Sequence, residues 1–357
     1  MVNTFAAHRG RSSRVAACAL AVAAVLAACG STPAPTPAEA ASVPTVSDAP
    51  SASAGSPSPL PTSSPDSSAS PSPSPSASAT PAGANLLGTD GRFTILLLGS
   101  DYRPSSPGNR TDAIMVISLN PATGAVAAFS VPRDTTGFPL PEGGKFGQKV
   151  NGLYQWYQSR NGHGMASLKN AISKAYGVEI DYGVLTGFTG VRNLVSAVGG
   201  VQVTLAKAYY DPIYWVNSRT QGWGLSAGTH QLSGETALIF ARSRKGDNDF
   251  NRARRQQQLV SAAVTKVLAK GSSILPKLLA IATGKIVTDL PLDRSLDLYS
   301  LVATAKLSAV KSAVFGPRSF AYAASGTSFT PNIPACRAWV KKYFPPANPG
   351  ASWPAQS

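Results

Sequence analysis

The hydrophobic and polar positions of the chain form patterns that predict strands alternating with helices. Apolar runs short enough for buried strands occupy residues 93–98, 113–119 and 125–131, and an Asn-Pro-Ala-Thr-Gly turn joins the last two. Residues 207–228, rich in aromatic residues and glycine, are expected to form a loop. Further strands are predicted at 180–186, 201–205 and 313–323, and helices at 150–158, 165–176, 188–198, 233–240, 251–270, 273–282 and 293–306. This alternation predicts a layered α/β domain.

The first 30 residues have the pattern of an export signal. Three arginines precede an apolar run at residues 15–28, which is too short to cross a hydrocarbon core of about 30 Å as a helix. The run ends in Leu-Ala-Ala-Cys-Gly, which looks like a bacterial lipobox, in which the cysteine is acylated and becomes the new N-terminus. We therefore predict a signal peptide at residues 1–28 and lipidation at Cys29. The alternative is an ordinary secretory signal cut nearby, with Cys29 incidental; both predict export.

A change of composition marks the domain boundaries that follow. Residues 31–85 consist mainly of Ser, Pro, Ala and Thr, with no aromatic residue, Lys or Arg. Such a segment cannot bury enough apolar surface to offset its ordering entropy, so residues 29–85 are predicted to be a lipidated cysteine followed by a disordered tether. A glycosylated stalk is the alternative. The folded domain is expected at residues 86–330, and the proline-rich residues 331–357 are predicted to be an irregular tail.

Composition excludes several classes of site. After removal of the signal only Cys29 and Cys336 remain, so lipidation would leave one thiol and neither an intramolecular disulfide nor a cysteine-based metal site. Only His163 and His230 lie beyond the signal. Two histidines are few for a Ser-His-Asp triad and for a multi-histidine zinc site, so the composition disfavours both. The motifs HExxH and GxxxxGK[ST] are absent from the sequence.

The net charge of the chain is +15, and residues 86–357 carry all of it, because the basic residues of the signal balance the acids of the tether. Such a field attracts polyanions. An exported protein rarely meets nucleic acid as a substrate, so phosphate-bearing envelope components are the favoured partners. The alternative is that the charge serves solubility alone.

Charged side chains gather where three of the predicted strands begin or end. Residues 99–103 close the first strand, residues 110–112 open the second, and residues 132–134 close the third. In an α/β sheet the crevice outside the strand ends is where ligands bind. There Asp101 and Asp112 could supply two oxygen ligands to one Mg²⁺, which binds through one or two carboxylates plus substrate phosphates. Each segment alone is typical of turns and caps, but three together favour a site.

A second cluster contains arginines at residues 241–256. Arg242 and Arg244 project to the same side of an extended chain. If a helix begins near residue 249, the side chains of Arg252, Arg255 and Gln256 share one of its faces. Planar guanidinium groups suit bidentate phosphate recognition. A solvated basic helix end is the alternative for this stretch.

An ordered set of short segments in this chain resembles the LytR-CpsA-Psr family of bacterial cell envelopes. Each segment alone is weakly specific, but together they follow the order of the family from about residue 90 to 260. The matching segments are Leu97-Leu98-Gly99-Ser100-Asp101, Arg110-Thr111-Asp112-Ala113-Ile114-Met115, Val131-Pro132-Arg133-Asp134, Lys149-Val150-Asn151, Ile180-Asp181-Tyr182, Gly199-Gly200-Val201, Leu232-Ser233-Gly234-Glu235-Thr236-Ala237-Leu238, Ala241-Arg242-Ser243-Arg244, Asp249-Phe250-Asn251-Arg252 and Arg255-Gln256-Gln257.

This resemblance implies a three-layer α/β/α sandwich around a mixed central sheet, which holds a polyprenyl-linked diphosphate with its lipid tail in an apolar tunnel. Such enzymes transfer a glycopolymer phosphate from the lipid carrier to a hydroxyl of peptidoglycan or a related wall glycan, with pyrophosphatase activity as a side reaction. By position, Asp101 and Asp112 would hold Mg²⁺, with Mn²⁺ as an alternative ion. The diphosphate would be bound by Arg103, Arg110, Arg133, Arg242, Arg244, Arg252, Arg255 and Gln256. Catalytic roles are predicted for Arg133, Arg244 and Asp134; Asp112 and Asp134 are both candidate bases, and the base stays unassigned.

The expected partners follow from the resemblance: a polyprenyl-linked glycopolymer donor, a peptidoglycan or wall glycan acceptor, and the membrane through the N-terminal lipid. The protein is expected to be a monomer on the outer face of the bacterial cytoplasmic membrane, facing the wall, without a nucleic-acid partner. It departs from the family in its lipid anchor and in Thr186-Gly187-Phe188, which stands where the family often has a polar residue. The alternatives are a non-catalytic module that binds phosphorylated glycan or lipid, and a DNA-binding regulator.

Overall fold

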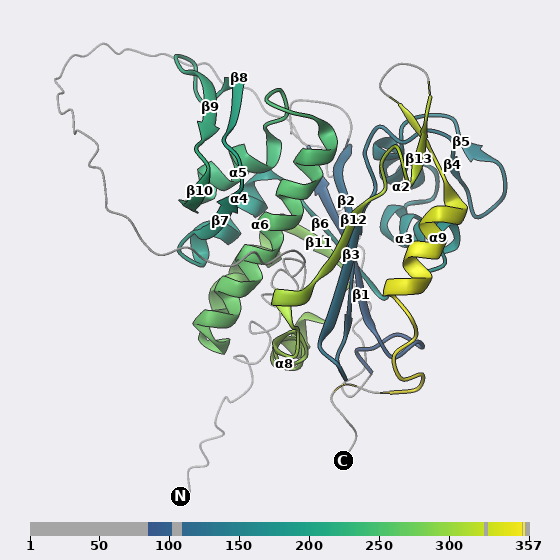
Figure 1. Cartoon of the computed structure of the whole chain (residues 1–357). Helices are drawn as coiled ribbons and strands as arrows, with labels where there is room; N and C mark the ends of the chain where they lie inside the picture. The colour runs from purple at the N-terminus through teal and green to yellow at the C-terminus, as the bar shows by residue number, and fades with distance from the viewer. Residues whose placement is uncertain (1–84, 102–108, 325–327, 352, 354–357) are drawn as a thin grey trace, which may run out of the picture. The chain divides into compact units, whose positions relative to one another are not determined.

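The computed structural model describes residues 85–101, 109–324, 328–351 and 353 of the chain (Figure 1). The predicted signal, residues 29–84 of the predicted tether with Cys29, and Arg103 lie outside the described residues, whereas Asn85, the last residue of the predicted tether, is described. No described helix is both long and apolar enough to cross a bilayer.

The centre of the domain is a mixed sheet of six strands in the order β11-β6-β1-β2-β3-β12. Strand β1 pairs with β2 in antiparallel and with β6 in parallel orientation, β2 and β3 are antiparallel, and β12 joins β3 in parallel. Because β6 runs parallel to β1, the C-terminal ends of β1, β3 and β6 and the N-terminal end of β2 meet at one edge. The strands are β1 (Phe93–Ser100), β2 (Thr111–Asn120), β3 (Ala125–Ser130), β6 (Tyr182–Thr186), β11 (Ile286–Thr288) and β12 (Lys311–Val314).

Strand β1 is buried on both faces, which explains its continuous apolar sequence. Phe93, Ile95 and Leu97 belong to one hydrophobic core, whereas Leu96 and Leu98 belong to the other. Successive side chains of a strand point to opposite faces, so the sheet separates two cores.

Helices cover both faces of the sheet and complete the three layers that the family resemblance implies (Figure 1). One layer consists of α4 (Phe188–Ala197), α5 (Gly234–Arg242), α6 (Asp249–Lys270), α7 (Leu275–Lys285) and α8 (Ser295–Ala303). The other consists of α2 (Leu153–Asn161), α3 (Gly164–Tyr176) and α9 (Ile333–Tyr343). Four 3₁₀ turns connect these elements at Val150–Gly152, Ser272–Ile274, Leu292–Arg294 and Leu307–Ala309.

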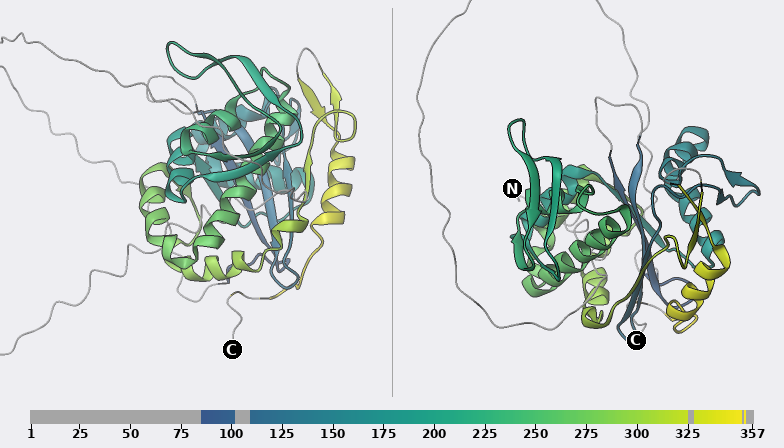
Figure 2. Two further views of the ribbon diagram at one scale, coloured as in Figure 1. Left: turned by 60° about the vertical axis from the view of Figure 1, so that its left-hand side comes forward. Right: turned by 45° about the horizontal axis from the view of Figure 1, so that its top comes forward.

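Two-stranded ribbons lie outside the central sheet, and one of them corrects the sequence prediction. Residues 207–228, expected to be a loop, contain the antiparallel hairpin of β8 (Tyr209–Trp215) and β9 (Gln221–Leu225). This hairpin lies near α4 and α5 in Figure 1 and projects from the body of the domain in the right-hand view of Figure 2. The other ribbons pair β4 (Phe138–Pro139) with β5 (Lys145–Phe146), β7 (Val201–Leu205) with β10 (Gly228–Leu232), and β13 (Ala321–Ala323) with β14 (Phe329–Pro331).

The C-terminal region also differs from its prediction, because residues 333–343 form α9 instead of an irregular tail. One of the prolines that suggested irregular structure, Pro334, stands in the first turn of this helix, where no backbone N–H is needed. The side chain of Asn332 caps the helix by accepting a hydrogen bond from Ala335 N at 3.2 Å. Cys336 and Val340 are buried in the core beside α3, so α9 is part of the domain and closes its second helical layer.

Candidate functional site

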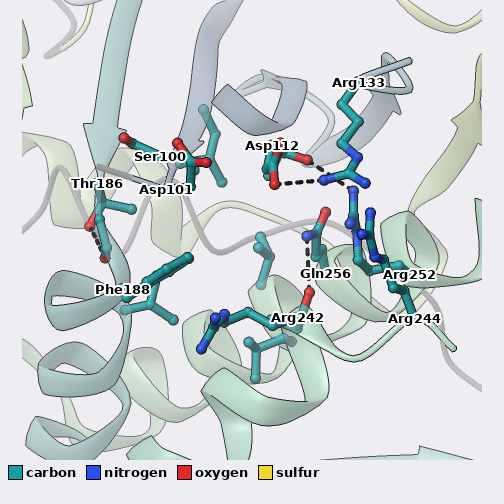
Figure 3. Close-up of a pocket in the computed structure, with 18 residues that line it drawn as sticks. Ser100, Asp101, Asp112, Arg133, Thr186, Phe188, Arg242, Arg244, Arg252 and Gln256 are labelled. Carbon is teal, nitrogen blue, oxygen red and sulfur yellow. Dashed lines mark hydrogen bonds and ion pairs between the residues drawn. The ribbon is translucent and has the colours of Figure 1, made fainter. Parts of the chain in front are cut away.

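A cavity of about 290 Å³ opens at the edge of the sheet where the ends of β1, β2, β3 and β6 meet (Figure 3). The sheet contributes a carboxylate-bearing side, and the ends of α4, α5 and α6 form the opposite side. In Figure 3, Asp101 and Asp112 lie across from Arg242 and Gln256. The lining residues are Leu97, Gly99, Ser100, Asp101, Asp112, Ala113, Arg133, Thr186, Gly187, Phe188, Val191, Ala241, Arg242, Arg244, Arg252, Gln256, Leu259 and Val260.

The side chain of Asp112 is fixed by two neighbours from different parts of the chain. Arg133 Nη1 donates to Asp112 Oδ2 at 2.7 Å, and Asn151 Nδ2 donates to Asp112 Oδ1 at 3.2 Å. Asp112 stands at the start of β2, Arg133 just after β3, and Asn151 in the 3₁₀ turn that precedes α2. Antiparallel pairing of β2 with β3 brings Asp112 and Arg133 together, so the register of the sheet sets the contact between them.

Arg133 and Arg252 share the carboxylate of Asp249, which begins α6. Arg252 Nη2 donates to Asp249 Oδ2 at 2.9 Å, and Arg133 Nε lies 3.7 Å from Asp249 Oδ1 and 3.6 Å from Asp134 Oδ2. Arg252 Nη2 also donates to the carbonyl oxygen of Asp112 at 3.3 Å. The two arginines from distant segments are therefore held beside one another at the cavity.

Burial and these ion pairs shift the pKa values of the site in opposite directions: burial favours the neutral form of each group, and an opposite charge favours its charged form. Burial alone would lower the pKa of Arg133, but the carboxylates of Asp112, Asp249 and Asp134 outweigh it and raise that pKa. Burial lowers the pKa of Arg252, with Asp249 opposing the change, and burial raises the pKa of Asp249 against Arg252 and Arg133. Among the described residues, the buried Nε atoms of Arg133 and Arg252 have no hydrogen-bond partner. A buried donor without a partner costs about 1–3 kcal/mol, so these two arginines are held at the cavity at the expense of stability.

Arg242 is held between two aromatic rings at the end of α5. Its guanidinium carbon lies 4.2 Å from the ring centroid of Phe188 and 6.0 Å from that of Tyr214, and Nη1 donates to Tyr214 Oη at 3.3 Å. Phe188 begins α4 and Tyr214 belongs to β8. Two cation–π contacts and one hydrogen bond thus orient this arginine towards the cavity that it lines.

The turn that carries Arg244 is organised by a buried carboxylate from the β8–β9 hairpin. Asp211 Oδ2 accepts hydrogen bonds from Ser243 Oγ at 2.7 Å and from the backbone N–H groups of Arg244 and Lys245, each at 3.0 Å. Asp211 is 1% exposed, so these bonds form away from water. Asp211 therefore fixes the backbone from which the Arg244 side chain projects.

The inner side of the cavity is apolar. Leu97 from β1, Val191 from α4, and Leu259 and Val260 from α6 line it, and all four residues belong to or pack against the first hydrophobic core. Charged residues at one end and aliphatic residues at the other give the cavity an amphipathic lining. It is therefore suited to a ligand that joins an anionic group to a hydrocarbon chain.

The residues present fit a magnesium ion bound together with a phosphate ligand. Asp101 and Asp112 contribute hard oxygen donors to one cavity, and Asp101 Oδ1 accepts a hydrogen bond from Arg110 N at 3.0 Å. Within the described part of the chain, no group of three or more His, Cys, Asp and Glu side chains could hold a metal ion by itself. Mg²⁺ commonly keeps several waters and binds through one or two carboxylates plus phosphates, so two carboxylates match its needs.

The structure brings together most of the residues singled out from the sequence. Asp101, Asp112, Arg133, Arg242, Arg244, Arg252 and Gln256 all line the cavity, whereas their individual roles stay predictions. Arg110 is exposed and does not line the cavity; its backbone N–H and carbonyl group bond to Asp101. Asp134 also lies outside the lining, where it pairs with Lys149.

Arg255 was expected to share the diphosphate-binding face of α6, but its guanidinium lies elsewhere. It is buried among the end of α5 and the β8–β9 hairpin, with Nε donating to Phe240 O at 3.1 Å and its guanidinium carbon 4.0 Å from the ring centroid of Tyr209. Its other partners are the carboxylate of Asp247 and the carbonyl oxygen of Ser243. Neighbouring residues of a helix project about 100° apart, so Gln256 reaches the cavity and Arg255 does not.

Four residues that organise the site were given no role from the sequence. Asn151 and Asp249 stand in segments that match the family pattern, so their positions carried a signal. Asp211 and Tyr214 stand in the stretch expected to be a loop, and no local pattern marks them. Their contacts with residues 242–245 arise only when the hairpin packs against the end of α5.

Sequence comparisons identify a family model and curated relatives that match this chain. A model of the LytR_cpsA_psr family matches residues 63–321. A protein of Bacillus mycoides, named polyisoprenyl-teichoic acid–peptidoglycan teichoic acid transferase TagU, is 32% identical over 208 residues, which are 57% of this chain and 62% of that protein. The cell wall biosynthesis protein LcpA of Corynebacterium glutamicum is 27% identical over 251 residues, covering 59% of this chain and 46% of that protein. The chain thus spans between about half and three fifths of the length of these curated relatives.

Solved structures share the fold at lower sequence identity. TagT bound to LIIa-WTA superimposes with a TM-score of 0.57 at 22% identity, covering 74% of this chain and 97% of that one. TagV of B. subtilis superimposes with a TM-score of 0.55 at 23% identity, covering 71% of this chain and 97% of that one. These likenesses support the three-layer architecture around the mixed sheet.

Proposed function

Because the chain belongs to the LytR_cpsA_psr family, we propose that it transfers a glycopolymer phosphate from a polyprenyl diphosphate carrier to a hydroxyl of peptidoglycan or a related wall glycan. The observation that carries the proposal is the amphipathic cavity, in which arginines and carboxylates face one another above an aliphatic floor. A diphosphate joined to an isoprenoid chain has the same division between charge and hydrocarbon. The relatives named as teichoic acid transferases support the same class of reaction.

In this proposal the arginines neutralise the diphosphate and the leaving phosphate. Arg133 and Arg252 project from the β3 end and from α6, while Arg242 and Arg244 approach from the end of α5. As the bond to the transferred phosphorus breaks, negative charge grows on the departing polyprenyl phosphate. Preorganised donors aimed at that charge stabilise the transition state more than the ground state. Arg133 and Arg244 are the residues to which we assign this role.

Asp101 and Asp112 would hold the magnesium ion, which would supply charge neutralisation at the phosphate oxygens when bound. The residues of the chain do the rest. Asn151 and Arg133 hold the Asp112 carboxylate in place, and Leu97, Val191 and Leu259 exclude water from the inner end of the cavity. Asp134, a candidate base, is paired with Lys149 outside the lining, so the base stays unassigned.

We further propose that the protein is exported and anchored by a lipid on Cys29, on the outer face of the cytoplasmic membrane. The lipobox-like sequence supports this proposal. Expression of wild type and Cys29→Ala in a bacterial host, followed by membrane fractionation at high salt, tests it: the variant is expected to leave the membrane fraction. Retention of Cys29→Ala equal to that of wild type would refute lipid anchoring at this residue.

The transfer reaction is tested with purified full-length protein, a polyprenyl diphosphate-linked sugar, wall oligomers and Mg²⁺. Wild type is expected to release polyprenyl phosphate and to label the oligomers. Arg133→Ala and Arg244→Ala are each expected to lower turnover about 10²-fold, comparable with the loss of one preorganised donor. Arg254→Ala is the matched control, because Arg254 is exposed on α6 and donates only to Asn251 Oδ1 among the described residues. Binding of the donor without release of polyprenyl phosphate would instead identify a non-catalytic binding module.

Magnesium dependence has a separate test. Asp112→Ala is expected to raise the Mg²⁺ concentration needed for half-maximal turnover, since it removes one of the two carboxylates from the cavity. Titration of turnover against Mg²⁺ and Mn²⁺ measures the shift. Turnover that is unchanged by chelation of divalent ions would remove the metal from the proposal.

A further inference from the structure

The exposed apolar side chains of the described residues concentrate on one element. Of the seven large hydrophobic residues that are exposed, Tyr210, Ile213, Trp215 and Val216 belong to β8 and the turn after it. Trp215 is 59% exposed and Ile213 is 50% exposed. Single exposed apolar residues are ordinary on protein surfaces, but four within positions 210–216 of one hairpin favour an interaction site.

The hairpin is built to present these side chains, because its base is anchored and its turn is fixed. Trp223 of β9 packs edge-on against Phe240 and lies 6.4 Å, between ring centroids, from Tyr209. At the tip, Asn217 Oδ1 accepts hydrogen bonds from Arg219 N and Thr220 N, each at 2.9 Å. The tip therefore has a defined conformation in which its apolar side chains face solvent.

The exposed charges of the hairpin itself are of one sign. Arg219 is exposed at the tip and Lys207 is exposed just before the base, and the only acidic residue between positions 205 and 228, Asp211, is buried. Aromatic side chains with a polar edge, together with exposed basic residues, match the interface of an anionic bilayer. A protein partner would instead require acidic groups to complement these cations.

We propose that the tip of the β8–β9 hairpin, residues 213–219, inserts into the interfacial region of an anionic phospholipid bilayer. Trp215, Ile213 and Val216 would lie among the headgroups and upper acyl chains, and Arg219 would meet lipid phosphates. The proposal rests on the proposed function in one respect: a lipid-linked donor resides in that bilayer, so docking brings the cavity to the donor.

The contacts of the hairpin with the cavity explain why this element suits that task. A Cβ atom added to Gly246 would lie 1.9 Å from the Tyr210 carbonyl oxygen, so β8 packs directly on the backbone that follows Arg244. Asp211 caps the same turn, and Tyr214 Oη accepts from Arg242. The docking element and two arginines of the cavity are therefore one structural unit.

Local fluorescence tests docking independently of catalysis. In full-length protein with Cys18→Ser and Cys29→Ser, the introduced cysteine of Val216→Cys is labelled with the fluorophore NBD; Cys336 is fully buried and stays unlabelled. Vesicles contain equal parts of phosphatidylglycerol and phosphatidylethanolamine, or phosphatidylcholine alone. The matched control is the same label at Leu296→Cys, which is 66% exposed on α8, at the other end of the domain in Figure 1.

The label at position 216 is expected to shift to the blue, to brighten several-fold and to be quenched by spin-labelled lipid on anionic vesicles, and to respond less at high salt. The label at position 296 is expected not to respond. No response at 216, or equal responses at both positions, would overturn the proposal. A response only when a second unlabelled copy or another protein is added would assign the tip to a protein interface and likewise overturn it.

Turnover separates a failure of docking from a failure of the proposed function. Ile213→Ser combined with Trp215→Ser is expected to lower turnover about tenfold with a vesicle-embedded donor and to leave turnover of a water-soluble, short-chain donor unchanged. Equal turnover of both donors by this variant and wild type would overturn docking. If wild type turns over neither donor, the proposed function fails, while the fluorescence result still decides docking.

Discussion

Arg255→Met is expected to destabilise the fold while leaving the charged lining of the cavity in place. The substitution keeps an unbranched stem in the buried position and removes only the guanidinium. In the structure that group joins three elements: it donates to Phe240 O and Ser243 O at the end of α5, pairs with Asp247, and stacks on Tyr209 of β8. It therefore acts as a clamp between α6, α5 and the hairpin.

The magnitude follows from the groups that lose their partner. Each carbonyl oxygen left without its donor costs about 1–3 kcal/mol, and loss of the cation–π contact costs about 0.5–2 kcal/mol. Asp247 is partly exposed, so water can solvate its carboxylate after the change. Because these terms are not additive, we expect the free energy of unfolding to fall by about 3–5 kcal/mol, close to the cost of breaking a buried ion pair.

Urea denaturation followed by circular dichroism measures the change, with the midpoint and slope fitted separately. Arg254→Met is the matched control: it removes the neighbouring guanidinium, which is exposed, and should change the free energy by about 0.5 kcal/mol or less. The reasoning would be refuted if the two variants were equally stable. A fully stable Arg255→Met protein with about 10²-fold lower turnover would return Arg255 to the diphosphate site.

Three further predictions test other parts of the structure. Asp211→Asn should lower both turnover and the free energy of unfolding, because the amide is uncharged and, with its oxygen towards the Arg244 turn, places an NH₂ group against Ile213 N, which donates to Asp211 Oδ1 at 3.2 Å; kinetics on the folded protein and urea titration separate the two effects. Burial raises the pKa of Asp181 from 3.8 to about 8, so the folded state holds its proton where the unfolded state has lost it. Stability should therefore fall as pH rises from about 4 to about 8, and Asp181→Asn should flatten that dependence in thermal melts at several pH values. Burial also raises the pKa of Cys336 to about 12, so in the Cys18→Ser and Cys29→Ser background a thiol reagent should react only after denaturation; rapid reaction of the native protein would contradict the packing of α9.

The sequence carried enough information for the layered fold and for most of the cavity. Residues 93–98 are apolar without interruption because β1 has a core on each side, and this pattern is visible without any tertiary knowledge. The polar segments that follow or precede β1, β2 and β3 come together because the strands pair side by side. Asp101, Asp112 and Arg133 could thus be placed in one crevice before the structure was known.

Local signals failed where a segment takes its structure from distant partners. The β8–β9 hairpin has no regular alternation of apolar and polar residues, because its base packs on α5 while its tip stays exposed. Helix α9 contains a proline that is usually read as a helix breaker, yet that proline stands in the first turn and the rest of the helix is held by the second core.

By itself the sequence determined which residue types stand at the strand ends and on α6, since periodicity, turns and caps depend on short-range geometry. Only the tertiary structure decided which arginines face the cavity. Gln256 and Arg255 are neighbours on α6, but a rotation of about 100° turns one to the cavity and the other into the clamp with α5. Likewise, Asp211 acquires its role only when the hairpin packs on residues 243–245, because a buried carboxylate is stable only where several donors converge on it.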